Sequence, residues 1–375
     1  MKNIVFIVNQ LRKSGPIYVL YNLVANLDRS NFNPIIIKLM VDDFDRSYSN
    51  RFRELQIEML ELNYSFYSLE LNTRGVARRL DELLVSRKID IIHSHGYHPL
   101  LVMSYMKTLA YKIDTQHCIS LDSFRQSRGY LVGTYMHFRY IYRLQKINLG
   151  ISISKTVRSF FCKCVQSVPF VVVYNGIDVG RFKVSNELEK EKCRKILGFP
   201  NDELLIVIVG HLSRLKDPLV IIRSFKSLID KRLINKCSLI FCGDGELRKK
   251  CESMCLDYPM IKFIGYTNEV NEYLKAANYS ICASHSEGFG LNYIEALIAG
   301  NLVVSSNIGA FNEFANLYPL LGKFQFEVAN EASLEKVLLS ALNSRIDILS
   351  TSTKASNDFS AVRMAREYMK IYDTI

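Results

Sequence analysis

The chain has 375 residues, of which 49% are hydrophobic and 23% charged, and it carries a formal net charge of +11 at pH 7. This length is too great for one typical core and predicts two globular domains of about 150 to 200 residues each. No run approaches about eighteen consecutive apolar residues, so no transmembrane helix is expected, and the 9 scattered cysteines argue against a secreted disulfide-linked scaffold. We expect a cytoplasmic protein whose positive charge suits nucleic acid, an anionic membrane face or a phosphate-bearing substrate.

Short apolar runs alternate with longer helical patterns along the whole chain. This alternation is typical of β-α-β units, in which helices join parallel strands. The first run is too short for a signal peptide and is better explained as a buried strand. Strands are predicted at residues 4–8, 34–40, 89–93, 170–174, 204–209, 238–242, 261–263, 279–282 and 302–305. This order predicts two doubly wound α/β domains.

Several residues that could face a ligand follow the early strands. Gly15 and Pro16 precede a helical pattern at 19–27, where glycine gives a flexible turn and proline suits the first helical position. His95 ends a later strand and His117 follows another β-like position. Both histidines are well placed, because open parallel sheets bind ligands at the carboxyl ends of their strands. A purely structural role for each histidine remains the alternative.

Residues 125–146 differ from the rest of the first half because cations and aromatic rings alternate along them. One helical face could be basic with rings beside it, and such a segment can bind at a membrane interface. The alternative is an ordinary amphipathic helix that packs its rings on the domain core. The cations are Arg125, Arg128, Arg139, Arg143 and Lys146.

The second half begins after a charged stretch, residues 183–203, which we interpret as an interdomain linker with a short helix. The strand predicted at 204–209 is followed by His211, Arg214 and Lys216. Cations after a strand can hold a diphosphate, because they offset its negative charge. Farther on, residues 243–248 invite comparison with a dinucleotide-binding loop, but an arginine occupies the third glycine position and the fingerprint fails.

Residues 279–300 predict a strand, a tight glycine turn and a helix that starts at Leu291. Gly288 and Gly290 allow a ligand to approach the backbone, and the N–H groups that open a helix attract phosphate. Glu287 lies in the turn and Glu295 lies eight residues later. Carboxylates placed in this way accept hydrogen bonds from sugar and ribose hydroxyls.

Four motifs, in this order, resemble those of the family 4 retaining glycosyltransferases, which have the GT-B fold. Residues 173–178 resemble the element V-x-N-G-V/I-D, and residues 210–216 resemble G-R-L-S-x-x-K with His211 in place of the arginine. Residues 243–245 resemble the G-x-G loop of the family, and residues 287–296 match its signature E-G-F-G-x-x-x-x-E-A. Near the N-terminus, the family has a G-G pair where this chain has Ser14-Gly15, so only the second glycine is present.

The resemblance implies two Rossmann-like domains that face a cleft, with a C-terminal helix that crosses back to the first. The expected boundaries are residues 1–182 for an acceptor-binding domain, 183–203 for the linker, 204–355 for a donor-binding domain and 356–375 for the returning helix. Chemistry would take place between the domains. No side-chain nucleophile is required, because the departing phosphate is thought to assist the incoming hydroxyl on the same face.

The resemblance also implies a role for each matching residue. Glu287 would hold hydroxyls of the donor sugar, Glu295 the ribose, and Lys216 with Arg214 the diphosphate. The implied catalytic residues are Glu287 and His117, and His95 and Ser14 lie on the acceptor side. The implied donor-binding residues are Gly15, His211, Arg214, Lys216, Gly243, Gly245, Ile264, Glu287, Gly288, Phe289, Gly290, Leu291 and Glu295.

The implied function is metal-independent, retaining transfer of a sugar from a UDP- or GDP-linked donor, without a cofactor. The expected acceptor is a glycan or a polyprenyl-diphosphate-linked glycan of a bacterial O-antigen or capsule, reached from the inner face of the cell membrane. No nucleic-acid partner and no metal site are expected, because the charge is spread out and the cysteine pairs lack further ligands. A sugar-nucleotide epimerase remains an alternative. Because a histidine replaces the usual arginine at position 211, a non-catalytic partner protein is also an alternative.

Overall fold

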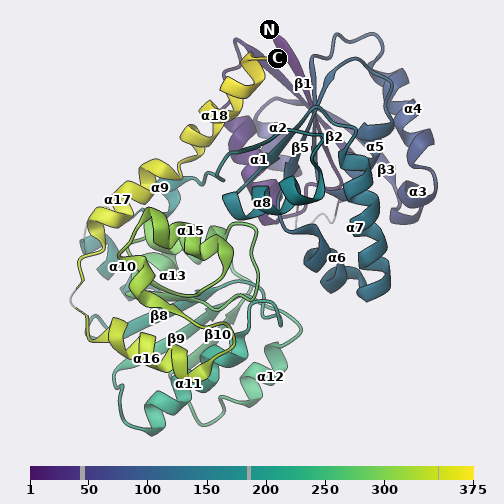
Figure 1. The fold of residues 1–375 in the computed structure, drawn as a ribbon. Coiled ribbons are helices and arrows are strands. Elements are labelled where there is room, and N and C mark those ends of the chain that lie inside the picture. The colour runs from purple at the N-terminus through teal and green to yellow at the C-terminus, as the bar shows by residue number, and fades with distance from the viewer. Residues whose placement is uncertain (43–46, 184–186, 345) are drawn as a thin grey trace. The chain divides into compact units, whose positions relative to one another are not determined.

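The computed structural model describes residues 1–42, 47–183, 187–344 and 346–375 (Figure 1). The chain forms two compact units, one made of Met1–Gly176 with Ala361–Ile375 and the other of Ile177–Ser360. Both units have a parallel β-sheet flanked by helices, as the strand and helix pattern predicts. Among the described residues, no helix is both long enough and apolar enough to cross a membrane.

The first unit contains a seven-stranded sheet in the order β3-β2-β1-β4-β5-β6-β7, with every neighbouring pair parallel. The strands β1 and β2 are largely apolar and buried, which explains why hydrophobic runs predicted them, whereas β5 and β6 were not predicted, and β5 carries the polar residues Asp114, Thr115 and Gln116. The strands are β1 (Lys2–Val8), β2 (Phe32–Met40), β3 (Glu58–Tyr64), β4 (Ile91–His95), β5 (Tyr111–Gln116), β6 (Leu149–Ser152) and β7 (Phe170–Val172).

Helices cover both faces of this sheet. They are α1 (Gly15–Ala25), α2 (Ser49–Glu54), α3 (Phe66–Leu71), α4 (Thr73–Leu84), α5 (Tyr97–Tyr105), α6 (Ser120–Arg128), α7 (Tyr130–Leu144), α8 (Lys155–Cys164) and α18 (Ala361–Asp373). On β4, His93 Nδ1 lies 2.8 Å from the hydroxyl of Tyr372 on α18. The next residue, Ser94, donates to Asp114 on β5, which also accepts from Tyr140 on α7. Successive side chains of a strand point to opposite faces, so α18 and α7 cover opposite faces of the sheet.

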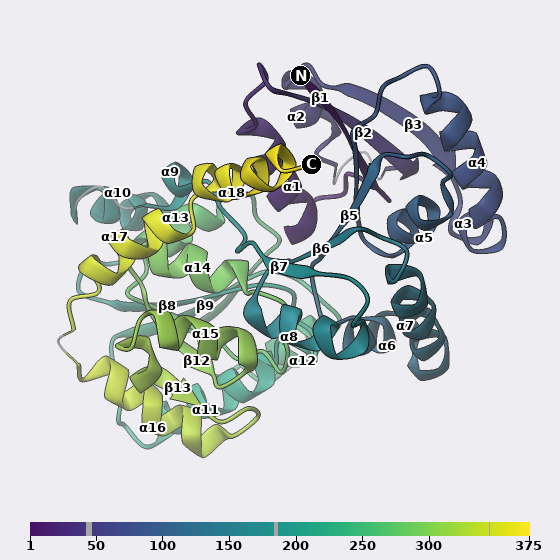
Figure 2. The same ribbon diagram turned by 45° about the horizontal axis from the view of Figure 1, so that its top comes forward.

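The last helix of the chain belongs to the first unit, which confirms the predicted returning helix. In both Figure 1 and Figure 2, α18 (yellow) lies beside α1, and the two helices are in contact. Its tyrosines Tyr368 and Tyr372 are fully buried against β4 and β5. The preceding helix, α17 (Leu349–Asp358), belongs to the second unit, so the return begins at residue 361 rather than 356.

The second unit contains a six-stranded sheet in the order β10-β9-β8-β11-β12-β13. Its strands are β8 (Leu204–Val209), β9 (Cys237–Cys242), β10 (Ile261–Gly265), β11 (Tyr279–Cys282), β12 (Leu302–Ser306) and β13 (Gln325–Phe326). Its other helices are α9 (Val179–Phe182), α10 (Glu187–Leu197), α11 (Pro218–Asp230), α12 (Arg248–Ser253), α13 (Val270–Ala276), α14 (Leu291–Ile298), α15 (Gly309–Leu317), the 3-10 helix η2 (Leu321–Phe324) and α16 (Glu331–Leu342). Parallel pairing joins each neighbouring pair of strands.

The expected linker at 183–203 packs into the second unit instead of standing apart from it. Residues 184–186 lie outside the described residues, but α10 follows them and contacts α13. The buried Arg194 on α10 donates to the carbonyl of Ala276 at 3.0 Å and to Asn278 Oδ1 at 2.7 Å. Lys275 on α13 pairs with Glu189 at 2.7 Å. The short helix expected in this stretch is present as α10, but the division between the two units lies near residue 177.

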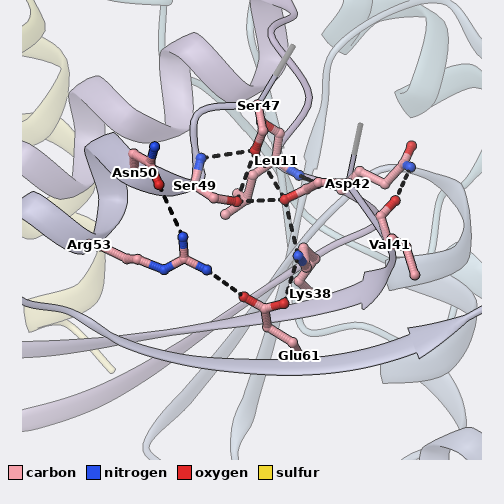
Figure 3. Close-up of polar contacts among 10 residues, drawn as sticks. Leu11, Lys38, Val41, Asp42, Ser47, Ser49, Asn50, Arg53 and Glu61 are labelled. Carbon is pink, nitrogen blue, oxygen red and sulfur yellow. Dashed lines mark hydrogen bonds and ion pairs between the residues drawn. The ribbon is translucent and has the colours of Figure 1, made fainter. Parts of the chain in front are cut away.

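A buried polar cluster ties the loop after β1 to the end of β2 (Figure 3). Asp42 accepts from the N–H of Leu11 at 2.7 Å and from the hydroxyl of Ser49 at 2.5 Å, and it pairs with Lys38 at 3.1 Å. Lys38 pairs also with Glu61 on β3 at 2.9 Å. Burial alone would raise the pKa of Asp42, but the hydrogen bonds from Ser49, Lys38 and Leu11 together lower it.

Candidate active site

A small pocket opens in the second unit at the carboxyl ends of β8 and β11. These two strands are neighbours, and the strand order reverses between them, because β9 and β10 continue on one side and β12 and β13 on the other. Such a reversal leaves a crevice in which open α/β sheets bind ligands. The pocket is lined by Ile208, Val209, Gly210, His211, Leu212, Lys216, Pro218, Ile281, Cys282, Ala283, Ser284 and Asn292.

Two of the predicted residues meet at this pocket. Lys216, from the loop after β8, forms an ion pair with Glu287, from the loop after β11. The hydroxyl of Ser284 donates to the same carboxylate oxygen at 2.9 Å. A lysine and a carboxylate that share one crevice can bind complementary parts of one ligand, the cation a phosphate and the carboxylate a hydroxyl.

The loops that carry Lys216 and Glu287 are fastened together next to this pair. The N–H of His285 donates to the carbonyl of Leu215 at 2.8 Å, and His285 Nε2 lies 2.8 Å from Asp217 Oδ2. Asp217 has a left-handed backbone with φ 42° and ψ 61°, and it also caps α11. A left-handed non-glycine residue persists only where its surroundings hold it. The bond between His285 and Asp217 therefore contributes to the placement of Lys216.

We expect His285→Ala to lower kcat/KM for the reaction at this site by about tenfold, because small misplacements of binding groups are costly in catalysis. His285→Gln should restore most of the activity, since its amide can donate to Asp217. The measurement is steady-state kinetics of the three proteins. Full activity of His285→Ala would show that the side-chain bond does not position the site.

The start of α14 lies at the same strand ends. Gly290 is the N-cap, with a left-handed φ of 96°, and a Cβ there would lie 2.6 Å from the ring of Phe311. Glycine is therefore required at this position. Asn292, in the first turn, donates to the carbonyl of Val209 at 2.9 Å and so fastens the helix start to the end of β8. The start of α14 is thus well suited to bind an anion.

Glu295 lies one turn farther along α14 and is partly buried. Burial raises its pKa to about 7, although Arg181 partly offsets this shift. Among the residues that the structure describes, none forms a hydrogen bond with its carboxylate. Burial raises the pKa of the nearby Cys282 thiol. The charges of Glu287 and Glu295 raise it further, whereas the charge of Lys216 lowers it. Glu295 thus offers an acceptor without a protein partner near the pocket.

The other predicted donor-side residues differ in how they are placed. Gly243 is required for packing, because a Cβ there would lie 1.8 Å from the carbonyl oxygen of Gly210. Gly245 similarly packs against Leu212, so the G-x-G loop supports the loop after β8. Phe289 has its ring in the core, which leaves only its backbone for a ligand. The remaining members are His211 and Arg214, both exposed, Gly288, which is buried, and Ile264 and Leu291, which are partly buried.

In the first unit, the structure brings the two predicted histidines together. His95 Nδ1 lies 3.0 Å from His117 Nε2, and the other ring nitrogen of His95 is buried without a described partner. Burial lowers the pKa of His117 to about 4, so the ring is neutral near pH 7. His93 instead bonds Tyr372 and Thr115 and is structural. Ser14, the exposed N-cap of α1, and Gly15, which opens the helix, lie in the loop after β1.

The sequence analysis assigned no role to four residues that shape the site. They are Ser284, Asn292 and the hydrogen-bonded pair of Asp217 and His285. The bonds of Asn292 with Val209 and of His285 with Asp217 join segments that are 83 and 68 residues apart, whereas Ser284 lies only three residues before Glu287. The nearest sequence signal for Asp217 is its place directly before Pro218, because an aspartate N-cap followed by proline is typical of a helix start. Within the described ranges, no three His, Cys, Asp or Glu side chains form a group able to hold a metal ion.

Comparisons with known proteins cover nearly the whole chain. The model for glycosyl transferases group 1 matches residues 189–357, and the model for glycosyltransferase family 4 matches residues 14–181. The O-antigen biosynthesis glycosyltransferase WclY of Escherichia coli is 22% identical, over 99% of this chain and 98% of the relative. The UDP-Gal:alpha-D-GlcNAc-diphosphoundecaprenol alpha-1,3-galactosyltransferase of Escherichia coli is 26% identical over 62% of each chain. An uncharacterised glycosyltransferase of Methanocaldococcus jannaschii is 27% identical, over 44% of this chain and 43% of its own length.

Solved structures show the same fold. The HepE protein of Anabaena, in complex with UDP and glucose, superposes over the full length of both chains with a TM-score of 0.78 and 16% identity. Sucrose-phosphate synthase from Thermosynechococcus elongatus gives a TM-score of 0.81 at 15% identity, over 100% of this chain and 99% of that one. The two family models together span both units, the solved structures share the GT-B fold, and both findings agree with the motifs. The chain therefore belongs to the family 4 glycosyltransferases.

Proposed function

We propose that this enzyme transfers a sugar from a UDP- or GDP-linked donor to a hydroxyl of a glycan or lipid-linked glycan acceptor. The observation that carries the proposal is the meeting of Lys216, Glu287 and the start of α14 at the crevice between β8 and β11. The diphosphate would lie against Lys216 and the N–H groups of α14. Glu287 would accept hydrogen bonds from the sugar, and Glu295 from the ribose.

We propose further that the transfer retains the anomeric configuration and needs no metal ion. Positive charge for the leaving diphosphate would come from Lys216 and from the dipole of α14, at the point where charge develops. Nuclear magnetic resonance of the first-formed product would show an anomer that matches the donor, and turnover in EDTA would equal turnover in magnesium. An inverted product, or loss of turnover in EDTA, would contradict this part of the proposal.

The acceptor proposal rests on the first unit and on the relatives. The hydrogen-bonded pair of His95 and His117 lies at the carboxyl ends of neighbouring strands, where ligands of open sheets bind. The Escherichia coli relatives are named for O-antigen biosynthesis and for transfer to a diphosphoundecaprenol-linked sugar. We therefore propose a polyprenyl-diphosphate-linked acceptor of surface-polysaccharide synthesis, reached by peripheral attachment to the inner face of the membrane.

The test is incubation with labelled UDP- and GDP-sugars and a set of polyprenyl-diphosphate-linked glycans, with products separated by chromatography. The proposal predicts label in the lipid fraction for one donor. Isomerised donor without transfer would identify an epimerase. Nucleotide binding without turnover on any acceptor lipid would favour a non-catalytic partner protein.

The raised pKa of Glu295 gives a prediction about pH. Ribose hydroxyls donate to an ionised carboxylate, and a pKa of about 7 means that this form becomes dominant as the pH rises from 6 to 8. We expect the affinity for a nucleoside diphosphate to rise severalfold more over this range in the wild type than in Glu295→Gln. Isothermal titration calorimetry with nucleoside and 2′,3′-dideoxynucleoside diphosphates measures these affinities at each pH. An identical pH dependence for both proteins and both ligands would remove Glu295 from the ribose site.

A further inference from the structure

A row of large apolar side chains on α7 is exposed in the first unit. Leu131, Tyr135, Phe138 and Tyr142 follow one another at intervals of four, three and four residues, which places them on one side of a helix. All four are at least 60% exposed, and Leu131 reaches 82%. Scattered exposed apolar residues are ordinary, but a contiguous row of this size marks an interaction surface.

Two cations of α7 bond other parts of the first unit, which corrects the expectation of one basic helical face. The segment forms two helices, α6 and α7, separated at Gly129 with its φ of 81°. Arg139 forms an ion pair with Glu70 on α3, and Arg143 donates to Ser104 at 2.8 Å. These guanidinium groups fasten α7 to the rest of the unit. The exposed face that remains is aromatic and aliphatic.

The ion pair of Arg139 with Glu70 brings α3 next to the apolar row. Arg139 lies four residues after Tyr135 and three before Tyr142, so it borders the row on the helix surface. On α3, Tyr67 and Leu71 flank Glu70 in sequence and are 76% and 88% exposed. We call the six residues Tyr67, Leu71, Leu131, Tyr135, Phe138 and Tyr142 the α3–α7 surface. Within the first unit, α3 contacts α4, α4 contacts α5 and α5 contacts α7, and Figure 2 shows the four helices near one another.

Exposed cations lie at Arg128, a neighbour of α3, and on the elements next to the α3–α7 surface in sequence or in contact with it. Arg128 stacks its guanidinium 4.3 Å from the ring centroid of Phe66 at the start of α3. Arg74 lies 5.2 Å from the ring of Tyr105, the same ring that Arg143 covers from α7. Arg78 on α4 and Lys146 after α7 are exposed too. From residues 120 to 146 the chain has five cations and one acid, Asp122.

We propose that the α3–α7 surface binds the headgroup region of an anionic phospholipid membrane. Tyrosine and phenylalanine rings settle at the level of the headgroups, while the bordering arginines contact lipid phosphates. A second copy of the chain is a poorer occupant, because each copy carries a net charge of +11 and would repel the other. This inference rests on the proposed function, because a lipid-linked acceptor would lie at the membrane surface.

The experiment measures sedimentation of the full chain with vesicles of phosphatidylcholine alone and of phosphatidylcholine with phosphatidylglycerol. The double variant Leu71→Ser with Leu131→Ser removes one leucine from each helix of the surface. Its matched control is Leu256→Ser with Leu349→Ser, which removes two leucines that are 82% and 63% exposed in the second unit. All proteins are also tested for stabilisation by nucleoside diphosphates, which reports on the second unit.

We expect the wild type and the control to bind the anionic vesicles, with binding that weakens as salt rises. The surface variant should lose at least about tenfold in vesicle partitioning while it keeps its nucleotide-dependent stabilisation. Equal binding by the two double variants, or no binding by the wild type at low salt, would overturn the inference. So would a wild-type dimer that the surface variant alone disrupts. Vesicle binding without sugar transfer would leave this inference standing and contradict the proposed function instead.

Discussion

Replacement of Lys216 with methionine is expected to lower kcat/KM for sugar transfer by about 100- to 1,000-fold. A preorganised cation that meets a developing negative charge typically contributes this much to catalysis. Lys216 lines the pocket between β8 and β11, and its contact with Glu287 places it at the proposed diphosphate. Because the side chain comes from a loop, the fold should remain intact. Steady-state kinetics and the thermal unfolding profile of the purified variant measure both effects.

Glu287→Gln is the companion variant, and it separates the two halves of the donor. It should also lose transfer, since Glu287 is proposed to hold sugar hydroxyls rather than phosphate. Nucleoside diphosphate binding should be weakened in Lys216→Met but retained in Glu287→Gln. Unchanged turnover in either variant would remove that residue from the proposed site, and equal loss of nucleotide binding in both would contradict their separate roles.

Asp42→Ala is expected to destabilise the first unit by about 3 kcal/mol, because it breaks a buried ion pair. The side chains of Lys38 and Asp42 are only 5% and 6% exposed. The variant would leave Lys38 with Glu61 as its remaining partner and the N–H of Leu11 without its acceptor. Because Lys38 keeps its ion pair with Glu61, the expected loss of stability lies at the lower end of the range for broken buried pairs. Urea unfolding should show a midpoint lowered by roughly 1 to 2 M.

The matched control is Glu82→Ala in the same unit, which removes an exposed pair with Arg79. Such pairs contribute at most about 1 kcal/mol, so its midpoint should hardly change. The pH dependence gives a second test. The folded pKa of Asp42 is lowered, so its stabilising contribution is present above the unfolded value of about 3.9 and is lost as the pH falls. A wild-type advantage over Asp42→Ala that does not shrink in acid would contradict this account.

The donor-side loops were predictable because their signals are local. The strands at 204–209 and 279–282 and the helix at 291–298 agree with the structure at both ends. The two strands are largely buried and apolar, Gly210 directly follows the first of them and Gly290 directly precedes the helix, and the sequence shows these features directly. Two of the four family motifs, at residues 210–216 and 287–296, then follow the two neighbouring strand ends where the sheet order reverses.

Features that depend on distant partners were not predictable in the same way. The strand β3 lies at a sheet edge and alternates polar with apolar residues, so no hydrophobic run marks it. The charged helix α10 looked like a linker because its partner Asn278 lies 84 residues from Arg194. The direction of Arg139 and Arg143 depends on Glu70 and Ser104, which no helical pattern reveals.

The measurement that tests the central claim most directly is a thermal-shift panel of nucleoside diphosphates and nucleotide sugars, with EDTA or magnesium, on the wild type and Lys216→Met. Ligands that bind the folded state raise the midpoint by mass action. The account predicts stabilisation of the wild type by one base in EDTA and a much smaller shift for Lys216→Met. No shift with any nucleotide, or equal shifts in the two proteins, would contradict a donor site between β8 and β11.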